Sequence, residues 1–339
     1  MIRTTRYDCS IVWLRRDLRL SDNAALHQAA KHSARICMAF VLDPVLLRSE
    51  RAGAPIVQFF FSALQALRED LLRRQSDLVL LEGASDRELM TLARSVNAQA
   101  LFFNEDYEPG AVERDRCVER AFEQSGIAVH HFADHVYASA SELLSDSGEP
   151  YRLFAPYKRR WLQQQRLSRK TPFPSQRLSA GQLLIGSELP RSQAVPKPEA
   201  YGHRSSADFP CGSEAGARAA LTSFLRKGGP ALRYAIDRNF PGRNGTSHLS
   251  PHLRAGTIGI RTCIAAAAQA AGEGDERTDM DVWLSELIWR DFYQQILRNF
   301  PHVVSEPFRS VVGLQLRNCD AEFAAWCTAR TGYPIVDAA

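Results

Sequence analysis

The sequence has 339 residues, a formal net charge of +4, 45% hydrophobic residues and 24% charged residues. This balance is ordinary for a globular protein with a substantial core, and it excludes a disordered, collagen-like or disulfide-scaffold protein. The sequence contains no signal peptide and no apolar run near the ~18 residues of a membrane span. Seven scattered cysteines without a Cys-x-x-Cys pair indicate reduced thiols and a cytoplasmic location.

The first 132 residues alternate strand-like and helix-like patterns. Strands are predicted at 10–14, 35–42, 77–81, 100–104 and 127–132, with helices ending at residue 32 and spanning about 55–74, 85–95 and 109–125. This alternation predicts an α/β domain with a doubly wound parallel sheet, whose ligands bind at the carboxyl ends of the strands. The sequence has no glycine before Gly53, so the first strand–helix turn cannot carry a glycine-rich dinucleotide motif.

The rest of the chain changes character twice. Residues 133–210 are rich in Ser, Pro and Arg and predict an interdomain linker with one helix near 155–168. Residues 211–339 predict a second, all-α domain, with helices at 213–226, 231–238, 248–258, 260–272, 280–299 and 320–328.

The basic residues are clustered. Residues 151–175 contain seven Lys/Arg and no acid, and residues 211–261 contain eight Lys/Arg against Glu214 and Asp237. Such clusters are typical of proteins that bind a polyanion, because each neutralised phosphate releases counterions. A solvated basic face is the alternative that the pattern leaves open.

The helix at 281–300 places Glu286, Trp289, Arg290, Tyr293 and Leu297 on one stripe and apolar residues on the opposite side. This pattern predicts a buried helix, in which lone charges are costly. Two explanations remain equal: Glu286 and Arg290 pair at i, i+4, or both line a cavity where they meet a ligand.

Thr246 and Ser247 follow Gly245 just before a predicted helix, with Leu249 and Ser250 after them. Hydroxyls and free amides at the positive end of a helix suit a phosphate group. A plain helix N-cap is the alternative.

These segments together resemble the photolyase/cryptochrome family, and within it the bacterial enzymes that repair cyclobutane pyrimidine dimers. The resemblance covers six collinear stretches: 11–19 with 22–26, 103–108, 151–161, 245–250, 283–293 and 331–339. It implies a light-driven lyase in which reduced FAD donates an electron to a dimer in UV-damaged DNA. It implies no membrane as a partner.

The resemblance implies roles for individual residues. FAD would be bound by residues matching the family's phosphate segment and flavin cavity: Tyr234, Thr246, Ser247, His248, Leu249, Ser250, Trp283 and Arg290. Glu286 would hydrogen-bond the damaged bases and Trp289 would pack against the flipped dimer, and both count as catalytic. DNA contacts would also involve Arg238, Arg290 and Tyr293. Tyr107 and Glu108 match part of a pocket for a folate or deazaflavin antenna chromophore.

The chain departs from the family pattern at several points, including Val311, which stands where many relatives place a tryptophan, and residues 303–305, which do not match the contacts of a folate antenna. His248 stands where the family commonly has Arg or Lys. Residues 331–339 match the start of a family segment, so we expect an incomplete flavin domain, which puts repair by these residues alone in question. The alternatives are a cryptochrome-type blue-light photoreceptor and an inactive remnant in which only the α/β domain folds.

Overall fold

The computed structural model describes residues 7–49, 52–174, 181–190, 192–205, 210, 212–270, 275–309 and 317–338, without the side chains of 275–277. The ends of the predicted helix at 260–272 and of the predicted helical domain at 211–339 therefore lie outside the described residues. The chain divides into two compact units, residues 1–301 and 302–339. No helix in the described residues is long and apolar enough to span a membrane.

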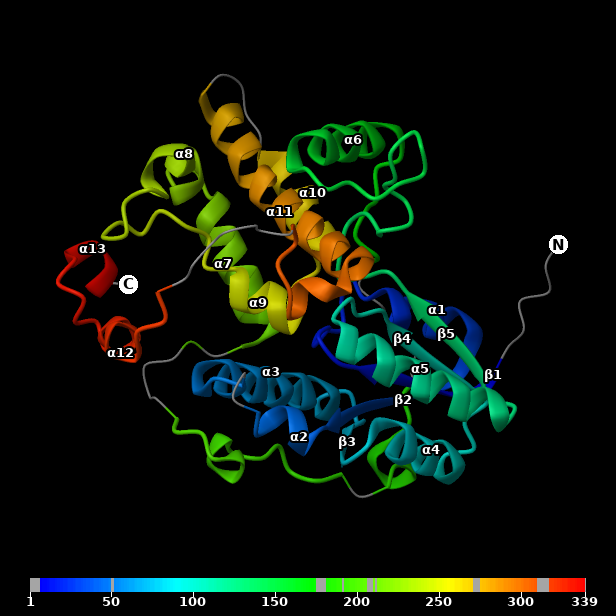
Figure 1. Cartoon of the computed structure of the whole chain (residues 1–339). Coiled ribbons are helices and arrows are strands. Elements are labelled where there is room, and N and C mark those ends of the chain that lie inside the picture. Colours follow the sequence, from blue (N-terminus) through cyan, green and yellow to red (C-terminus); the bar gives the residue numbers. More distant parts are fainter. Residues whose placement is uncertain are drawn as a thin grey trace. The chain divides into compact units, whose positions relative to one another are not determined.

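The first unit is built on a five-stranded parallel sheet (Figure 1). Its strands are β1 (Tyr7–Leu14), β2 (Ser33–Leu42), β3 (Leu78–Glu82), β4 (Ala100–Asn104) and β5 (Ala128–Phe132). They lie in the order β3-β2-β1-β4-β5, so β1 is central and Ile11 pairs with both Cys37 and Leu101. The prediction of a doubly wound parallel sheet is confirmed.

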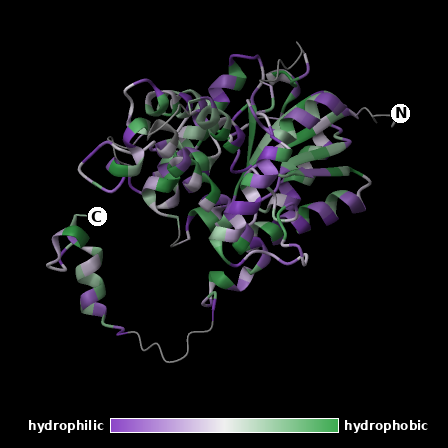
Figure 2. Cartoon of the chain, turned by 90° about the horizontal axis from the view of Figure 1, so that it is seen from above, coloured by the Kyte–Doolittle hydropathy of each residue, from purple (hydrophilic) through white to green (hydrophobic). Residues whose placement is uncertain are grey.

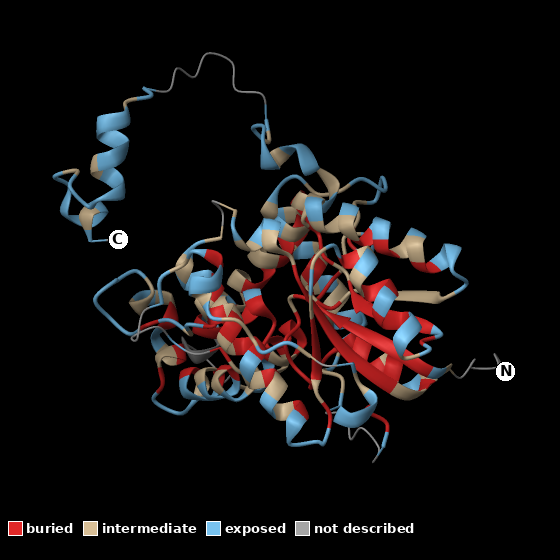
Figure 3. Cartoon of the chain, turned by 90° about the horizontal axis from the view of Figure 1, so that it is seen from below, coloured by how far each residue is buried: buried red, intermediate tan, exposed pale blue. Residues whose placement is uncertain are grey.

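Helices cover both faces of the sheet, because alternate strand residues point to opposite sides. On one face, Val12 and Leu14 pack with residues of α1 (Ala24–His32) and α3 (Ala54–Leu72). On the other, Ile11 and Trp13 pack with residues of α4 (Ser85–Ser95) and α5 (Pro109–Gln124). A short helix, α2 (Pro44–Leu47), follows β2. The central strands β1, β2 and β4 are mostly buried between these layers, whereas the edge strand β5 is of intermediate exposure (Figure 3).

The segment from 133 to 210 contains α6 (Phe154–Leu167), at the place predicted for its one helix, and two short 3-10 turns, Gly186–Glu188 and Pro198–Tyr201. Leu183 forms an isolated bridge with Ile36 of β2. This segment is therefore attached to the sheet at the start of β2.

The helical part of the first unit comprises α7 (Glu214–Leu225), a 3-10 turn (Pro230–Arg233), α8 (Tyr234–Asp237), α9 (Ser250–Ala255), α10 (Ile260–Ala270) and α11 (Asp275–Asn299). The second unit contains α12 (Asp320–Cys327) and α13 (Pro334–Asp337). In the first unit hydrophilic and hydrophobic residues share the helices, whereas the strands are mostly hydrophobic (Figure 2).

One predicted helix is longer than the observed one. The prediction of 248–258 fails at both ends, since α9 covers six residues. His248 has a positive φ of 51° and cannot continue a helix, and Gly256 ends α9 in the left-handed conformation with φ 74°. The helix predicted at 231–238 is a 3-10 turn followed by a single α-helical turn.

Candidate functional site

Three aromatic side chains from three helices form a continuous wall. The ring of Trp283 in α11 lies 5.0 Å from that of Phe224 in α7, which lies 5.7 Å from that of Tyr234 in α8. All three are buried. Asp279 of α11 accepts a hydrogen bond from the amide of Ala235, at 2.7 Å, and so fixes α8 against α11. The structure thus brings together Tyr234 and Trp283, two residues predicted to contact a cofactor.

Glu286 is paired with Arg238 across this wall. The carboxylate accepts a hydrogen bond from the guanidinium at 2.5 Å, which raises the pKa of Arg238. The two side chains are 37% and 31% exposed. A pair this open contributes only about 0.2–1 kcal/mol, so a bound base can compete for the Glu286 carboxylate.

Arg290 does not pair with Glu286, so the first of the two explanations left open by their spacing is wrong. Its guanidinium donates to the carbonyl oxygens of His135 and Leu253 and contacts Nε2 of His135 at 2.9 Å. Burial lowers the pKa of Arg290 to about 10. Arg290 therefore connects α11 to the segment that follows β5.

Trp289 is part of an aromatic platform, which we define as Phe154, Trp289 and Tyr293. The Phe154 ring of α6 is stacked on the indole, with ring centroids 3.4 Å apart and planes 7° apart. Tyr293 stacks at 5.5 Å and is 61% exposed. One face of the indole is thus covered by Phe154, and the platform reaches solvent through Tyr293.

The segment 245–250 lies against α8, because a Cβ on Gly245 would stand 2.8 Å from the backbone of Asp237. Thr246 and Ser250 are exposed, whereas the side chain of Leu249 is buried. Ser247 Oγ accepts a hydrogen bond from the Leu249 amide at 3.4 Å. Because α9 is a single short helix, the hydroxyls rather than its dipole would bind a phosphate.

The side chain of His248, in the middle of this segment, points to solvent. The exposed imidazole of His248 lies 2.8 Å from the side-chain oxygen of Asn244. The open hydroxyls of this segment therefore lie against α8, which carries Tyr234 of the aromatic wall.

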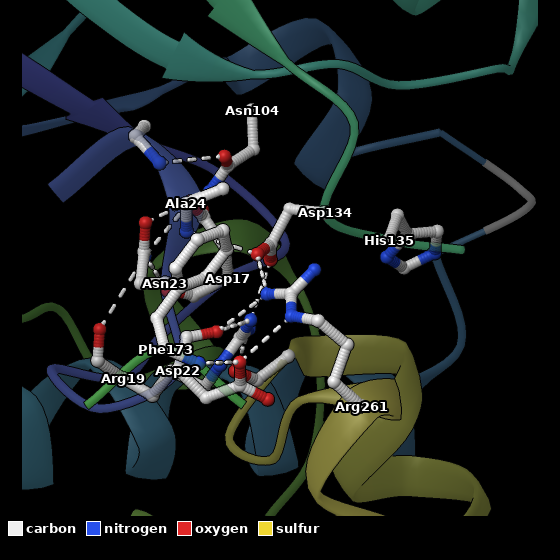
Figure 4. Close-up of polar contacts among 12 residues, drawn as sticks. Asp17, Arg19, Asp22, Asn23, Ala24, Asn104, Asp134, His135, Phe173 and Arg261 are labelled. Atoms are coloured by element: carbon white, nitrogen blue, oxygen red, sulfur yellow. Dashed lines mark hydrogen bonds and ion pairs between the residues drawn. The ribbon is translucent and has the colours of Figure 1, made fainter. Parts of the chain in front are cut away.

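A buried ionic cluster, which the sequence interpretation missed, joins the sheet to α10. It consists of Arg19, Asp22, Asp134 and Arg261, whose side chains are 2–4% exposed (Figure 4). Arg261 Nε donates to the Asp22 carboxylate at 2.8 Å, and both arginines donate to Asp134. Burial alone would raise the pKa of Asp134, but Arg19 and Arg261 together lower it.

The sequence does contain a signal for this cluster. Arg19 and Asp22 stand in the short connection between β1 and α1, a run of residues 15–23 in which charged and polar side chains follow directly after an apolar strand. Charges in such a position need partners, yet the partners lie far along the chain. Gly259, two residues before Arg261, allows the approach, since a Cβ there would collide with the Asp22 carboxylate.

His135 lies between two arginines. Its Nε2 is 2.6 Å from a nitrogen of Arg16 and 2.9 Å from a nitrogen of Arg290. Both neighbours are cationic donors, so Nε2 accepts both hydrogen bonds and the ring is neutral. Burial, Arg290 and Arg16 hold the pKa of His135 well below its usual value. This chain of contacts joins α11 to the carboxyl end of β1.

A cavity of about 520 Å³ lies between α3 and α9. Its walls are mainly apolar, from Leu46, Leu47, Ala52, Pro55, Ile56, Val57, Phe59, Phe60, Pro251 and Ala255, with Arg16, Ser250 and Arg254 adding polar groups. Glu108 accepts hydrogen bonds from both of these arginines.

Of the two residues predicted for an antenna pocket, one contacts the cavity wall and the other does not. Glu108 is attached to the cavity wall through Arg16 and Arg254. Tyr107 is 3% exposed, does not line the cavity, and its hydroxyl has no hydrogen-bond partner in the described part of the chain.

Comparison with known proteins identifies two matching families. Residues 10–177 match the DNA photolyase family and residues 283–339 match the FAD binding domain of DNA photolyase. Deoxyribodipyrimidine photo-lyase from Synechococcus sp. is 37% identical over 335 residues, which are 97% of this chain and 69% of that protein.

Two solved structures have the same fold. An archaeal photolyase from Sulfolobus tokodaii with two FAD molecules is 26% identical with a TM-score of 0.79, over 97% of this chain and 69% of that one. A Synechocystis cryptochrome, 22% identical with a TM-score of 0.85, covers 98% of this chain and 70% of its own and supports the fold alone.

Proposed function

The chain belongs to the DNA photolyase family, and from this premise we propose that it repairs cyclobutane pyrimidine dimers in UV-damaged DNA with light and reduced FAD. The observation that supports this most is that α11 carries Trp283 of the buried aromatic wall, the half-exposed carboxylate of Glu286 and Trp289 of the aromatic platform. As part of the same proposal we place the protein in the cytoplasm, where the six described cysteines, all free thiols, stay reduced.

The residues for the cofactor divide into two groups. We assign the phosphates to the hydroxyls and amides of Thr246, Ser247 and Ser250, with His248 and Leu249 shaping the loop. We assign the wall beside the rings to Tyr234 and Trp283, which exclude water there. When bound, reduced and light-excited FAD supplies the electron that splits the dimer and receives it afterwards.

The residues for the lesion lie on the exposed side of α11. The damaged bases leave the duplex at a cost of a few kcal/mol, which damage already lowers. Trp289 and Tyr293 then provide the stacking surface, worth about 1–3 kcal/mol per base. Glu286 leaves Arg238 to hydrogen-bond the bases, and the freed Arg238 guanidinium is available to a nearby phosphate.

Arg290 is assigned a different place in this scheme. Its observed partners are groups of the chain itself, so we propose that it positions α11 beside the cofactor instead of touching DNA.

Repair is tested by illuminating the purified chain with dimer-containing DNA, after measuring its flavin content. Glu286→Ala is expected to slow repair about 10–160-fold, because a hydrogen bond to a charged group is worth about 1.5–3 kcal/mol. Flavin content should be unchanged, and Glu123→Ala, an exposed glutamate of α5, is the matched control. Full activity in both Glu286→Ala and Trp289→Ala refutes the assignment. Equal affinity for damaged and intact DNA, without repair, would favour a photoreceptor.

The cavity between α3 and α9 supports a second proposal, a planar light-harvesting chromophore. Its apolar walls suit an aromatic ring system, and Arg16 and Arg254 suit acidic substituents. Ile56→Asp places a charge in the cavity wall. It should remove the absorption band of the light-harvesting chromophore and leave the flavin absorption unchanged. Leu72→Asp, on the same helix but outside the cavity and 53% exposed, should remove neither. A band that survives Ile56→Asp refutes this location.

A further inference from the structure

The loop that precedes α9 contains Asn244-Gly245, the one Asn-Gly pair of the sequence. In such a pair the backbone nitrogen of the glycine can attack the side-chain carbonyl carbon of the asparagine, because the glycine has no Cβ to block the approach. Asn244 is exposed, and the Gly245 amide donates no hydrogen bond to any described residue. The attacking nitrogen is therefore not held in a competing hydrogen bond.

His248 polarises the side-chain carbonyl group of the same asparagine. Its Nε2 lies 2.8 Å from Oδ1 of Asn244. Because an amide oxygen only accepts hydrogen bonds, Nε2 carries the proton and donates it. The hydrogen bond makes the side-chain carbon more electrophilic and stabilises the negative charge that develops on Oδ1 during the attack. The loop thus adds to the Asn-Gly pair a donor of the kind that accelerates acyl transfer.

The backbone around this pair is fixed on both sides. A Cβ on Gly245 would stand 2.8 Å from the backbone of Asp237, so no larger residue fits at this position. The Asp237 carboxylate accepts a hydrogen bond at 2.5 Å from Arg243, which directly precedes Asn244. His248 has a φ of 51°, a conformation that histidine adopts more readily than most other residues. The contact between the imidazole and Asn244 is therefore part of the folded loop.

We propose that Asn244 is a site of self-modification, which converts it to an acidic residue and weakens the binding of the flavin phosphates. The Gly245 nitrogen, after losing its proton to solvent, bonds to the side-chain carbon of Asn244. The bond between this carbon and Nδ2 breaks, and Nδ2 leaves as ammonia with a proton taken from solvent. Water then opens the cyclic imide to aspartate or isoaspartate, so the net reaction consumes one water and releases one ammonia.

The effect on the cofactor rests on the proposed function, which assigns the phosphates to Thr246, Ser247 and Ser250. Asn244 precedes these hydroxyls in the same loop, so its conversion adds a negative charge to the segment that binds negative groups. Two like charges about 4 Å apart in water repel each other enough to lower an affinity about fivefold. Isoaspartate also adds a backbone carbon next to Gly245, which has no spare room against α8. The conversion thus limits the time for which a chain holds FAD.

The conversion is tested by keeping the purified full chain at neutral pH and physiological temperature and following its tryptic peptides by mass spectrometry. Trypsin releases residues 239–243 and 244–254 as separate peptides, each with a single asparagine. Asn239 is the matched control, since it is also exposed but is followed by a phenylalanine. The peptide 244–254 should gain the mass difference between aspartate and asparagine, and the peptide 239–243 should not. An unchanged mass of 244–254, or an equal change in both peptides, overturns the proposal.

The role of His248 is tested with His248→Gly and His248→Asn, because glycine and asparagine both tolerate a φ of 51° and both lack the imidazole. The conversion of Asn244 should slow about 2–13-fold, which corresponds to a hydrogen bond worth about 0.5–1.5 kcal/mol. Far-ultraviolet circular dichroism identifies the variants that are folded. Conversion at the wild-type rate in a folded variant would overturn the role of the imidazole.

FAD binding is measured with Asn244→Asp, which carries the charge of the product from the start. Its affinity for FAD should be about fivefold below that of wild type at low salt, and added salt should reduce the difference. Asn97→Asp, at an exposed position after α4, adds the same charge elsewhere and should bind FAD like wild type. Equal affinities of Asn244→Asp and wild type would overturn the effect on the cofactor.

The two proposals fail separately, because the peptide masses report the conversion of Asn244 whether or not FAD binds. A lack of FAD binding in wild type and variants alike would overturn the proposed function together with the effect on the cofactor, and a mass change in 244–254 would then keep the modification. Normal FAD binding with an unchanged peptide 244–254 would do the reverse.

Discussion

Replacing Arg261 by methionine measures how strongly the buried ionic cluster holds the first unit together. The guanidinium is 4% exposed and pairs with Asp22 and Asp134. Its removal leaves the Asp22 carboxylate without a paired cation among the described residues and leaves Asp134 with Arg19 alone. Removing one partner of a buried pair destabilises by about 3–5 kcal/mol, because the remaining charge stays out of water.

The comparison is with an exposed ion pair in the same unit. Arg116→Met removes a pair with Glu113 whose side chains are 61% and 59% exposed, which should change the free energy of unfolding by at most about 1 kcal/mol. Urea unfolding followed by far-ultraviolet circular dichroism gives both values.

A double variant sharpens the test. Asp22→Asn combined with Arg261→Met should be less destabilised than the sum of the single variants, because the asparagine leaves no orphaned charge. If Arg261→Met destabilises no more than Arg116→Met, the reasoning about the cluster is refuted.

Three further predictions concern pH and close packing in the first unit. His135 is neutral when folded, so stability should fall below its unfolded pKa of 6.5, by about 2 kcal/mol at pH 5, and His135→Gln should abolish this loss in urea unfolding. Burial raises the pKa of Asp291 to about 6, so this carboxyl group lowers the stability of the fold as pH rises, opposite to the effect of His135. Between pH 4 and 6.5 the free energy of unfolding of Asp291→Asn should therefore increase by up to about 3 kcal/mol relative to wild type. Gly256→Ala should destabilise by more than about 2 kcal/mol, because φ is 74° and the Cβ would meet the Arg16 carbonyl, whereas Gly110→Ala, with open space around it, should be neutral or stabilising in thermal unfolding. An Asp291→Asn variant that follows wild type across this range, or equal effects of the two glycine substitutions, would contradict these arguments.

The fold was largely predictable because strand and helix periods are local properties. The five strands and the helices of the sheet lie within a few residues of their predicted positions. Besides the helix predicted at 231–238, the exception is α9, which is set by single residues: His248 and Gly256 hold backbone conformations that end a helix whatever the hydrophobic pattern.

The ion-pair partners of charged residues in the site were less predictable than the helices and strands. Spacing allows Glu286 to meet Arg290 four residues later, yet the observed partner is Arg238, 48 residues earlier. Likewise, nothing in the spacing of Arg19 and Asp22 indicates Arg261. Local pattern decides which residues share a face, whereas the packing of helices decides which charges meet.

The ionic cluster also bears on how the chain is synthesised. Asp134 precedes Arg261 by 127 residues, and Asp22 precedes it by 239. At about 5–20 residues per second, the sheet would leave the ribosome some 6–25 seconds before the cation that compensates both carboxylates. During this interval the Asp22 carboxylate, which follows the central strand β1, has no paired cation among the described residues and stays hydrated, whereas Asp134 already has Arg19. The connection between β1 and α1 therefore reaches its buried state only after α10 has been synthesised.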